Sequence, residues 1–275
     1  MRPNLVIIVT AAFTTCCVTA CMTTPVSGRK ALNIMPESEE IAMGESAYKD
    51  VLKKEKISHD SRLNAIVTRV GKRIAAVANK PEYQWQFVVI DSEVQNAFCL
   101  PGGKIAVYRG IIPITKNEAG LATVMAHEVT HALARHGGQR ITQNMELSLG
   151  MGIIQALLLR PGENDTAADQ QKRQMIMAGL GAGATVGIVL PFSRGDEAEA
   201  DEVGQILMAR AGYDPEESIR FWDRFSEATK GQSPPAFLSD HPSSPSRAQD
   251  LRDRLPTAKT EYERAPQHYG LGDAF

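Results

Sequence analysis

Two histidines and a glutamate stand close together at His127, Glu128 and His131. On a helix, residues four apart lie on one face, so both imidazoles can reach a single metal ion while the carboxylate lies beside them. Imidazole is a common zinc ligand, and a carboxylate near bound zinc can accept a proton from water. The spacing therefore predicts a metal centre with an adjacent base. The alternative is an ordinary amphipathic helix with partly buried histidines.

The surrounding sequence favours a buried helix. Thr115–Glu118 has the form of a capping box, and apolar residues then recur from Ala119 to Leu133 on a continuous surface. Gly137-Gly138 suits the end of this helix. A mostly buried helix would hold the two imidazoles rigidly, as a metal site requires.

A catalytic zinc normally takes three protein ligands and keeps one position open, so a third ligand must lie elsewhere. One known extension of the motif needs a glycine at position 134 and a histidine at position 137. This chain has Ala134 and Gly137 there, and His136 is one place out of register. We therefore expect the third ligand on another helix.

The segment Ser193–Asp201 opens a second helix that would run to Gly212. Glu197 and Asp201 share one face, so Glu197 can bind the metal while Asp201 accepts a hydrogen bond from a ligand histidine. Glu199 is expected to point elsewhere. Alternatively, these acidic residues only complement the helix dipole. Two histidines, a glutamate ligand and a glutamate base together are typical of zinc peptidases.

The first twenty residues have the features of an export signal, with an early Arg2 and an apolar run from Leu5 to Phe13. The run is too short to span a membrane. Val18–Cys21 resembles the lipobox of bacterial lipoproteins, which predicts acylation of Cys21; an ordinary signal peptide is the alternative. Because Met22 follows the cysteine, we expect a lipid anchor in the outer membrane, facing the periplasm.

Composition limits the possible functions. The chain has 275 residues, of which 43% are apolar and 23% charged, and its formal net charge is −2. This is enough for one substantial core, and the charge argues against a nucleic-acid partner. Cys16 and Cys17 would leave with the signal and Cys21 would be acylated. Cys99 would then be the one free thiol, without an internal disulfide.

The mature chain is expected to comprise a lipidated tether at 21–35, a main domain at 36–256 and a C-terminal tail at 257–275. Hydrophobic periodicity predicts two helices followed by two strands, at Pro36–Glu55, Asp60–Asn79, Trp85–Ile90 and Lys104–Tyr108. The second strand directly precedes the metal helix, and we expect it to offer an edge to an extended peptide. Alternatively, Asn96–Gly103 is only a loop.

Two stretches rich in glycine, alanine and methionine, Met145–Leu159 and Met175–Leu190, follow the metal motif. The second has no charge but is short for a membrane crossing. We expect it to be buried in the domain, with contact to a bilayer surface as the alternative. Further on, Asp214-Pro215 begins a predicted helix, and another is expected at 244–255.

Several short motifs occur in an order that matches a known family. They are Asn96-Ala97-Phe98, Pro101-Gly102-Gly103, the metal motif, Ser193-Arg194 with Glu197 and Asp201, Ala211–Pro215, and His241-Pro242. On these residues the chain resembles the HtpX-like and BepA-like gluzincin metallopeptidases over about Pro25 to Leu255. With its lipobox it looks most like the LoiP-type outer-membrane lipoprotein proteases. It shows neither the membrane spans of HtpX nor the helical-repeat tail of BepA-like members, so its partners are expected to differ.

The resemblance implies an α+β, mainly helical, zincin-like (gluzincin) fold with a small antiparallel sheet beside the metal helix. It implies one zinc per chain on His127, His131 and Glu197, with Glu128 as catalytic base. His241 would be either an inhibitory fourth ligand or a group that polarises the substrate carbonyl, and a loop histidine without such a role is the alternative. Arg247 is a weaker candidate for holding an oxyanion.

The resemblance further implies a zinc-dependent endopeptidase that hydrolyses misfolded or misassembled envelope proteins. Its partners would be such substrates, the outer membrane, and the outer-membrane assembly machinery or related proteases. The alternative is a lipoprotein chaperone or assembly factor for outer-membrane proteins, with little or no proteolysis.

Overall fold

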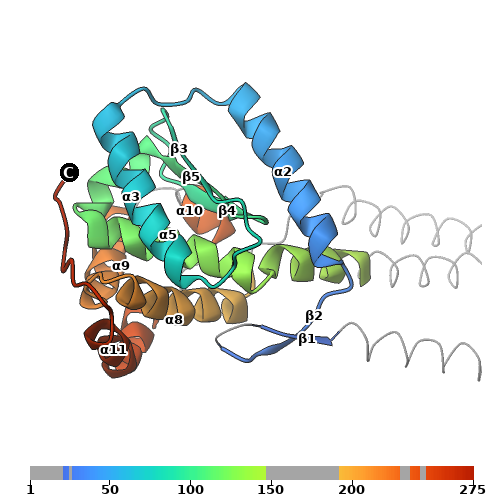
Figure 1. Ribbon diagram of the computed structural model, residues 1–275. Coiled ribbons are helices and arrows are strands. Elements are labelled where there is room, and N and C mark those ends of the chain that lie inside the picture. The colour runs from blue at the N-terminus through green and yellow to red at the C-terminus, as the bar shows by residue number, and fades with distance from the viewer. Residues whose placement is uncertain (1–20, 25–26, 147–191, 230–235, 242–245) are drawn as a thin grey trace, which may run out of the picture.

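The computed structural model describes residues 21–24, 27–146, 192–229, 236–241 and 246–275. Within these ranges the chain is mainly helical with two small β-sheets (Figure 1), as the sequence predicts. The expected export signal at 1–20, Met175–Leu190 and most of Met145–Leu159 lie outside the described residues. No described helix is both long and apolar enough to cross a membrane.

A β-hairpin and two helices come first. Strands β1 (Cys21–Thr23) and β2 (Lys30–Leu32) pair antiparallel, so much of the segment expected to be a polar tether is folded. Helices α2 (Glu37–Lys54) and α3 (Ser61–Val77) confirm the two helices predicted from periodicity. Asp60 caps α3 by accepting a hydrogen bond from a backbone N–H of its first turn.

The second sheet is mixed. Its strands are β3 (Gln86–Ile90), β4 (Ala97–Leu100) and β5 (Lys104–Tyr108), in the order β3-β5-β4. Strand β5 pairs parallel with β3 and antiparallel with β4. The expectation of an antiparallel sheet is therefore correct for the β4–β5 pair and wrong for the β3–β5 pair. Because β4 crosses to the far side of β5 before the chain turns back, β5 is central. The edge strands of this sheet are therefore β3 and β4, and not the strand that precedes the metal helix.

Helix α5 (Glu118–Leu133) carries the two motif histidines and is buried along its whole length. Its N-cap is Asn117, whose side-chain oxygen accepts a hydrogen bond from a backbone N–H at 2.8 Å. The expected capping box at Thr115–Glu118 is therefore wrong. Thr115 instead ends the short helix α4 (Ile112–Thr115), which follows a 3₁₀ turn, η1 (Arg109–Ile111), and its hydroxyl donates to a carbonyl of α4.

Helix α5 ends at Leu133, four residues before the expected glycine stop. Arg135 adopts a left-handed φ of 59° and turns the chain, after which residues 136–146 form a new helix. Gly138 lies inside this new helix, where a Cβ would come within 2.0 Å of a Glu40 oxygen. The turn at Arg135 brings His136 back beside the end of α5.

Helix α8 (Arg194–Arg210) packs against α5 and lies below it in Figure 1, on the side away from the mixed sheet. Gly204 permits a close approach of the two helices, because a Cβ there would lie 3.0 Å from the backbone nitrogen of His127. This packing places Glu197 and Asp201 opposite the motif histidines.

Three further helices follow α8 along the chain. They are α9 (Glu216–Thr229), α10 (Ala236–Asp240) and α11 (Arg247–Glu263). The helix expected after Asp214-Pro215 is confirmed as α9. The helix predicted at 244–255 is longer than expected, because α11 continues through Pro256 and includes the start of the expected tail.

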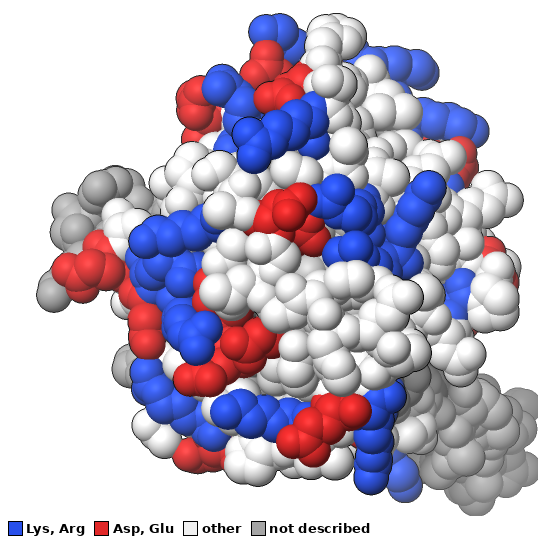
Figure 2. Space-filling view, turned by 60° about the vertical axis from the view of Figure 1, so that its left-hand side comes forward, with Lys and Arg blue, Asp and Glu red and all other residues white. Residues whose placement is uncertain are grey.

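Surface charges are mixed in sign. On the face shown in Figure 2, basic and acidic side chains are interspersed around a neutral patch. Together with the net charge of −2, this face does not offer the basic surface that nucleic-acid binding requires.

Candidate metal centre

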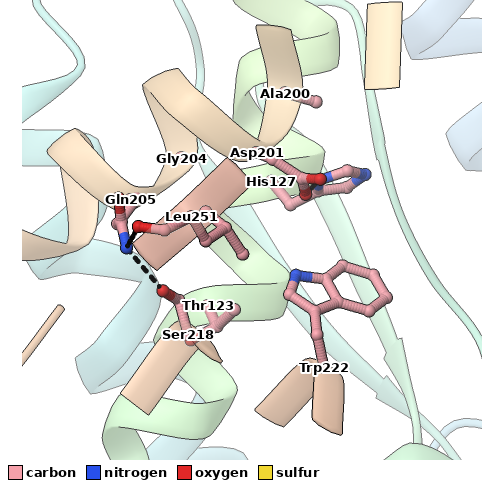
Figure 3. A pocket seen from close by; sticks show the side chains of 9 residues that line it. All are labelled: Thr123, His127, Ala200, Asp201, Gly204, Gln205, Ser218, Trp222 and Leu251. Carbon is pink, nitrogen blue, oxygen red and sulfur yellow. Dashed lines mark hydrogen bonds and ion pairs between the residues drawn. The ribbon is translucent and has the colours of Figure 1, made fainter. Parts of the chain in front are cut away.

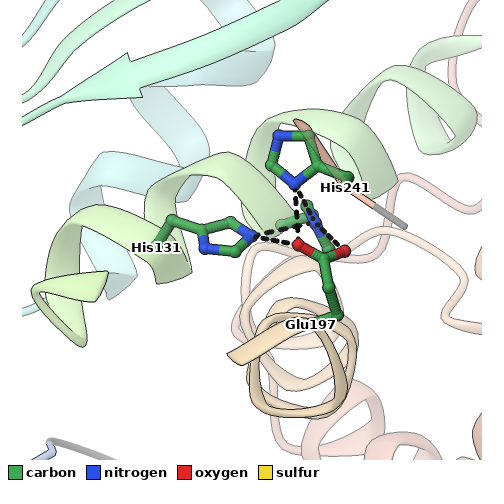
Figure 4. Close-up of side chains that lie close together, drawn as sticks. His131, Glu197 and His241 are labelled. Atoms are coloured by element: carbon green, nitrogen blue, oxygen red, sulfur yellow. Dashed lines mark hydrogen bonds and ion pairs between the residues drawn. The ribbon is translucent and has the colours of Figure 1, made fainter. Parts of the chain in front are cut away.

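Four ligand atoms meet where α5, α8 and the residue after α10 come together. They belong to His127, His131, Glu197 and His241, and all lie within 4.8 Å of one another. Figure 4 shows His131, Glu197 and His241 pointing toward a common centre. Each of the four residues is at most 4% exposed. The structure thus brings the side chains proposed from the sequence into one buried cluster.

The spacing of these atoms fits a small metal ion. His131 Nε2 lies 3.1 Å from His127 Nε2 and 3.4 Å from Glu197 Oε1. His241 Nδ1 lies 2.9 Å from the same glutamate oxygen. Four ligands at zinc distances around a tetrahedral centre are about 3.4 Å apart. Imidazole nitrogens with a carboxylate oxygen are also a donor set that zinc accepts.

The charges around the cluster also favour a cation. Glu128, Glu197 and Asp201 are buried carboxylates, and one buried cation, Arg247, contacts two of them. Its Nη2 donates to Glu197 at 2.7 Å, and its Nε donates to Asp201. The carboxylates outnumber the guanidinium that contacts them, so a bound cation would be favoured here.

Asp201 and Arg247 orient the first histidine and its surroundings. Asp201 Oδ1 lies 3.0 Å from His127 Nδ1, so that nitrogen carries the proton and Nε2 faces the cluster. Arg247 lies over the ring of Trp222 at 3.6 Å. Two of its three nitrogens hold Glu197 and Asp201, so Arg247 positions these carboxylates, while its Nη1 is buried without a hydrogen-bond partner among the described residues.

The surroundings favour the metal-binding protonation states of Glu197 and His131. Burial would lower the pKa of His127, but hydrogen bonds with Asp201 and Glu197 outweigh it and raise that pKa. Burial alone would raise the pKa of Glu197, but hydrogen bonds from the three histidines of the cluster outweigh it and hold that pKa well below its usual value. Burial, together with the neighbouring histidines, holds the pKa of His131 well below its usual value. Glu197 is therefore ionised and His131 neutral.

Glu128 lies at the border of the cluster. One of its oxygens is 3.5 Å from His241 Nε2, while His241 Nδ1 faces Glu197. The His241 backbone N–H donates to Phe237 C=O at 2.9 Å, and the two rings stack with centroids 4.6 Å apart. His241 is thus placed between the predicted base and the predicted ligands.

The sequence matches a family of known peptidases. The model of peptidase family M48 matches residues 61–255, which is more than half of the chain and includes every residue of the cluster. The chain belongs to peptidase family M48. The resemblance to HtpX-like and BepA-like metallopeptidases is thereby confirmed, and this M48 peptidase is a metal-dependent hydrolase.

Known proteins similar to this M48 peptidase include a metalloendopeptidase and two further proteases. The mitochondrial metalloendopeptidase OMA1 of Schizosaccharomyces pombe is 35% identical over 87% of this chain and 68% of its own length. The beta-barrel assembly-enhancing proteases of Yersinia pestis and Escherichia coli (strain K12) are 29% and 27% identical over 84% and 92% of this chain. The chain spans about half the length of these two relatives, 47% and 51%.

A hydrogen-bonded chain behind His131 was not predicted from the sequence. His136 Nδ1 lies 2.9 Å from His131 Nδ1, and His136 Nε2 lies 3.2 Å from Glu199 Oε2. Glu199 in turn contacts Ser27 and Arg29 of the N-terminal hairpin. The expectation that Glu199 points elsewhere is correct for the ligand cluster but wrong for the site as a whole.

Glu199 is held in its charged form. Burial alone would raise its pKa, but hydrogen bonds from His136, Ser27, Thr24 and Arg29 outweigh this and hold the pKa at about 2. Glu199 is only 5% exposed. A buried carboxylate with this many donors is a fixed acceptor within the site of this M48 peptidase.

A small pocket behind His127 is lined by residues of α5, α8, α9 and α11 (Figure 3). Gln205 Nε2 donates to Ser218 Oγ at 3.0 Å and to Leu251 C=O at 3.3 Å. Gln205 therefore ties three helices together one turn beyond Asp201. These contacts hold α8 against α9 and α11.

Proposed function

We propose that this M48 peptidase is a zinc-dependent endopeptidase, with one zinc on His127, His131 and Glu197 and with Glu128 as general base. The observation that best supports it is the buried cluster of these ligand atoms on two packed helices. Within the described part of the chain, no cysteine belongs to the cluster. Sets of two histidines and a glutamate serve catalytic zinc, whereas structural zinc usually closes with cysteine.

When bound, zinc supplies a Lewis acid that polarises a peptide carbonyl and lowers the pKa of a water. The Glu128 carboxylate would accept a proton from the attacking water and pass it to the leaving nitrogen of the peptide. Its position beside His127 puts this carboxylate at the border of the ligand cluster. Asp201 keeps the proton of His127 on Nδ1, and Arg247 holds Glu197 while the proton moves.

We assign His241 to the fourth position of the cluster, as an inhibitory ligand. Its Nδ1 lies 2.9 Å from Glu197 Oε1 and 3.3 Å from His127 Nε2. A fourth protein ligand takes the place that a catalytic site leaves open. His241 directly follows α10, so a shift of this short helix would open the site and free the imidazole to polarise a substrate carbonyl.

The edge of β4 is the proposed site for an extended substrate. Among the residues that the structure describes, β4 pairs with β5 alone. Tyr108 N–H donates to Asn96 C=O, so by alternation the backbone groups of Ala97 and Cys99 point away from β5. Strand β4 packs against α5, the helix that carries the proposed base, and burial and the charge of Glu128 raise the pKa of the Cys99 thiol. Pairing with such an edge depends little on substrate side chains.

The cellular setting is part of the same proposal. The lipobox at Val18–Cys21 supports cleavage after residue 20 and a lipid anchor on Cys21 in the outer membrane, facing the periplasm. The peptidase domain would then be 36–256. Likeness to beta-barrel assembly-enhancing proteases supports misfolded or misassembled envelope proteins as substrates and the assembly machinery or related proteases as partners.

A casein digest tests the proposed activity. The zinc-loaded protein should degrade casein, and a chelator should stop the reaction. Glu128→Gln should keep its zinc but cut at least about 10²-fold more slowly, since general-base catalysis contributes that much. Glu202→Gln, the same change on the partly exposed side of α8, is the matched control.

Two results would contradict the proposal. Full proteolysis by Glu128→Gln would show that another group is the base. A wild-type protein that keeps casein or an unfolded outer-membrane protein in solution without cutting it would favour the alternative of a lipoprotein chaperone.

A further inference from the structure

We propose that His136 is a positioning residue of the metal centre. It fixes the ring of His131 through a hydrogen-bonded chain that continues to Glu199 and ends at Arg29 in the N-terminal hairpin. The inference rests on the proposed zinc site, because it assigns a support to one of the proposed ligands.

The two motif histidines are supported differently. His127 Nδ1 lies 3.0 Å from a carboxylate oxygen of Asp201, which is a direct contact. His131 Nδ1 faces another imidazole, His136 Nδ1, at 2.9 Å, and the carboxylate of Glu199 follows one ring further out. Both ligands therefore lead to a buried carboxylate on α8, one directly and one through His136.

Metal binding would set the direction of every bond in this chain. His131 must offer the lone pair of Nε2 to the metal, so its proton stays on Nδ1 and is donated to His136 Nδ1. His136 then carries its proton on Nε2 and donates it to Glu199 Oε2, 3.2 Å away. Each donor then has an acceptor, and such a chain strengthens along its length.

The backbone explains how His136 reaches this place. The left-handed turn at Arg135 separates α5 from the helix at 136–146, and the ring of His136 lies 4.9 Å from that of His131. His136 is fully buried at 0% exposure. A fully buried imidazole is costly unless its nitrogens are hydrogen-bonded, and here both nitrogens have a partner.

Arg29 holds the outer end of the chain. Its Nε donates to Glu199, and its Nη2 donates to Asp196 Oδ1 at 2.7 Å and to Gln139 Oε1 at 3.0 Å. Asp196 and Glu199 flank the proposed ligand Glu197 on α8. One side chain of the hairpin therefore joins α8 to the helix at 136–146 beside the metal centre.

The contribution of Arg29 should be smaller than that of His136. Its side chain is 34% exposed, so water competes for its hydrogen bonds and screens its charge. It is nevertheless the link by which a displacement of the hairpin would reach the metal ligand.

Zinc affinity of the full chain, measured by competition with a chromophoric chelator, tests the proposal without any need for peptidase activity. His136→Phe keeps an aromatic ring but removes both hydrogen bonds, and it should weaken zinc binding about 10- to 100-fold. His136→Gln should recover most of the affinity, because its amide oxygen can accept from His131 while its amide nitrogen donates to Glu199.

The visible spectrum of the cobalt-substituted protein provides a second readout. It should change in His136→Phe, where the ring of His131 is free to rotate, and should stay close to wild type in His136→Gln. Arg29→Gln should weaken zinc binding by no more than about fivefold. Its exposed neighbour Lys30, changed to Gln, is the matched control and should leave the affinity unchanged.

Unchanged zinc affinity and cobalt spectrum in His136→Phe would overturn the proposal. Equal losses in the Phe and Gln variants would overturn it as well, because packing would then be the contribution of His136. Melting of the metal-free protein shows whether His136→Phe folds. If it does not fold, Glu199→Gln takes its place, and an unchanged zinc affinity in that variant would overturn the proposal. A wild-type chain without zinc affinity would refute the metal site itself, which is a separate failure.

Discussion

Helix α5 has a cluster of charged side chains at each end, and the two clusters balance their charge differently. At the N-terminal end, buried Glu118 forms ion pairs with Arg69 and Arg73, and the Tyr213 hydroxyl donates to it at 2.9 Å. The backbone N–H of Glu118 also donates to the carbonyl of Asp273 near the end of the chain. The charge of Glu118 is therefore balanced by side chains of the polypeptide itself.

At the C-terminal half of the same helix, carboxylates outnumber cations. Glu128, Glu197 and Asp201 face one guanidinium, and the two imidazoles of α5 turn their Nε2 atoms to the same point. A buried excess of negative charge is unfavourable unless a cation joins it. The charge at one end of α5 is balanced within the polypeptide, whereas at the other end it suits the metal ion that we propose.

Metal removal should have the largest effect. A site that binds only the folded state adds about 2.7 kcal/mol to the free energy of unfolding when zinc is present at 100 times its Kd. For a chain of this size we expect a melting temperature about 5–10 °C lower after chelation, together with complete loss of proteolysis. Calorimetry of the zinc-loaded and chelated protein measures this. Identical melting curves would contradict the difference between the two ends of α5.

Asp201→Asn should weaken the metal end specifically. The change removes the charge that orients His127 and turns an amide group toward Arg247, so zinc affinity should fall about 10- to 100-fold. Competition with a chelator measures the zinc affinity. The substitution should lower the melting temperature of the chelated protein less than that of the zinc-loaded protein. Wild-type affinity in this variant would show that the contact with His127 does not orient the ligand.

Glu118→Gln should weaken the other end. The amide leaves Arg69 and Arg73 without their charged partner, and we expect a loss of about 1–3 kcal/mol in the free energy of unfolding. This loss should be the same with and without zinc, because the cluster is far along the helix from the ligands. A denaturant titration under both conditions measures it. If Glu118→Gln lowered zinc affinity as much as Asp201→Asn, the proposed difference between the two ends of α5 would be wrong.

The ligand cluster could be proposed from the sequence because its residues are a few positions apart on two predicted helices. His127 and His131 are one helical turn apart, and Glu197 and Asp201 repeat that interval on a second helix. The chain behind His131 could not be found in this way. It depends on the left-handed turn at Arg135, which shortens α5 and brings His136 to an inner position that no helical spacing predicts.

The fold was predictable where periodicity alone decides the structure. Helices α2 and α3 and strand β5 follow their hydrophobic patterns. The order of strands did not follow, because alternation shows which face of a strand is buried but not which strand lies beside it. The hairpin of β1 and β2 was not predicted either, because its polar residues resemble a linker in the sequence. The contacts of Arg29 with α8 are visible only in the structure.

The central claim is that Glu197 completes a zinc site begun by His127 and His131. Elemental analysis of the purified chain after dialysis tests it most directly, with Glu202→Gln on the same helix as the control. We predict one zinc per chain in wild type and in Glu202→Gln, and little or none in Glu197→Gln. A Glu197→Gln protein that retains one zinc with wild-type affinity would contradict the account.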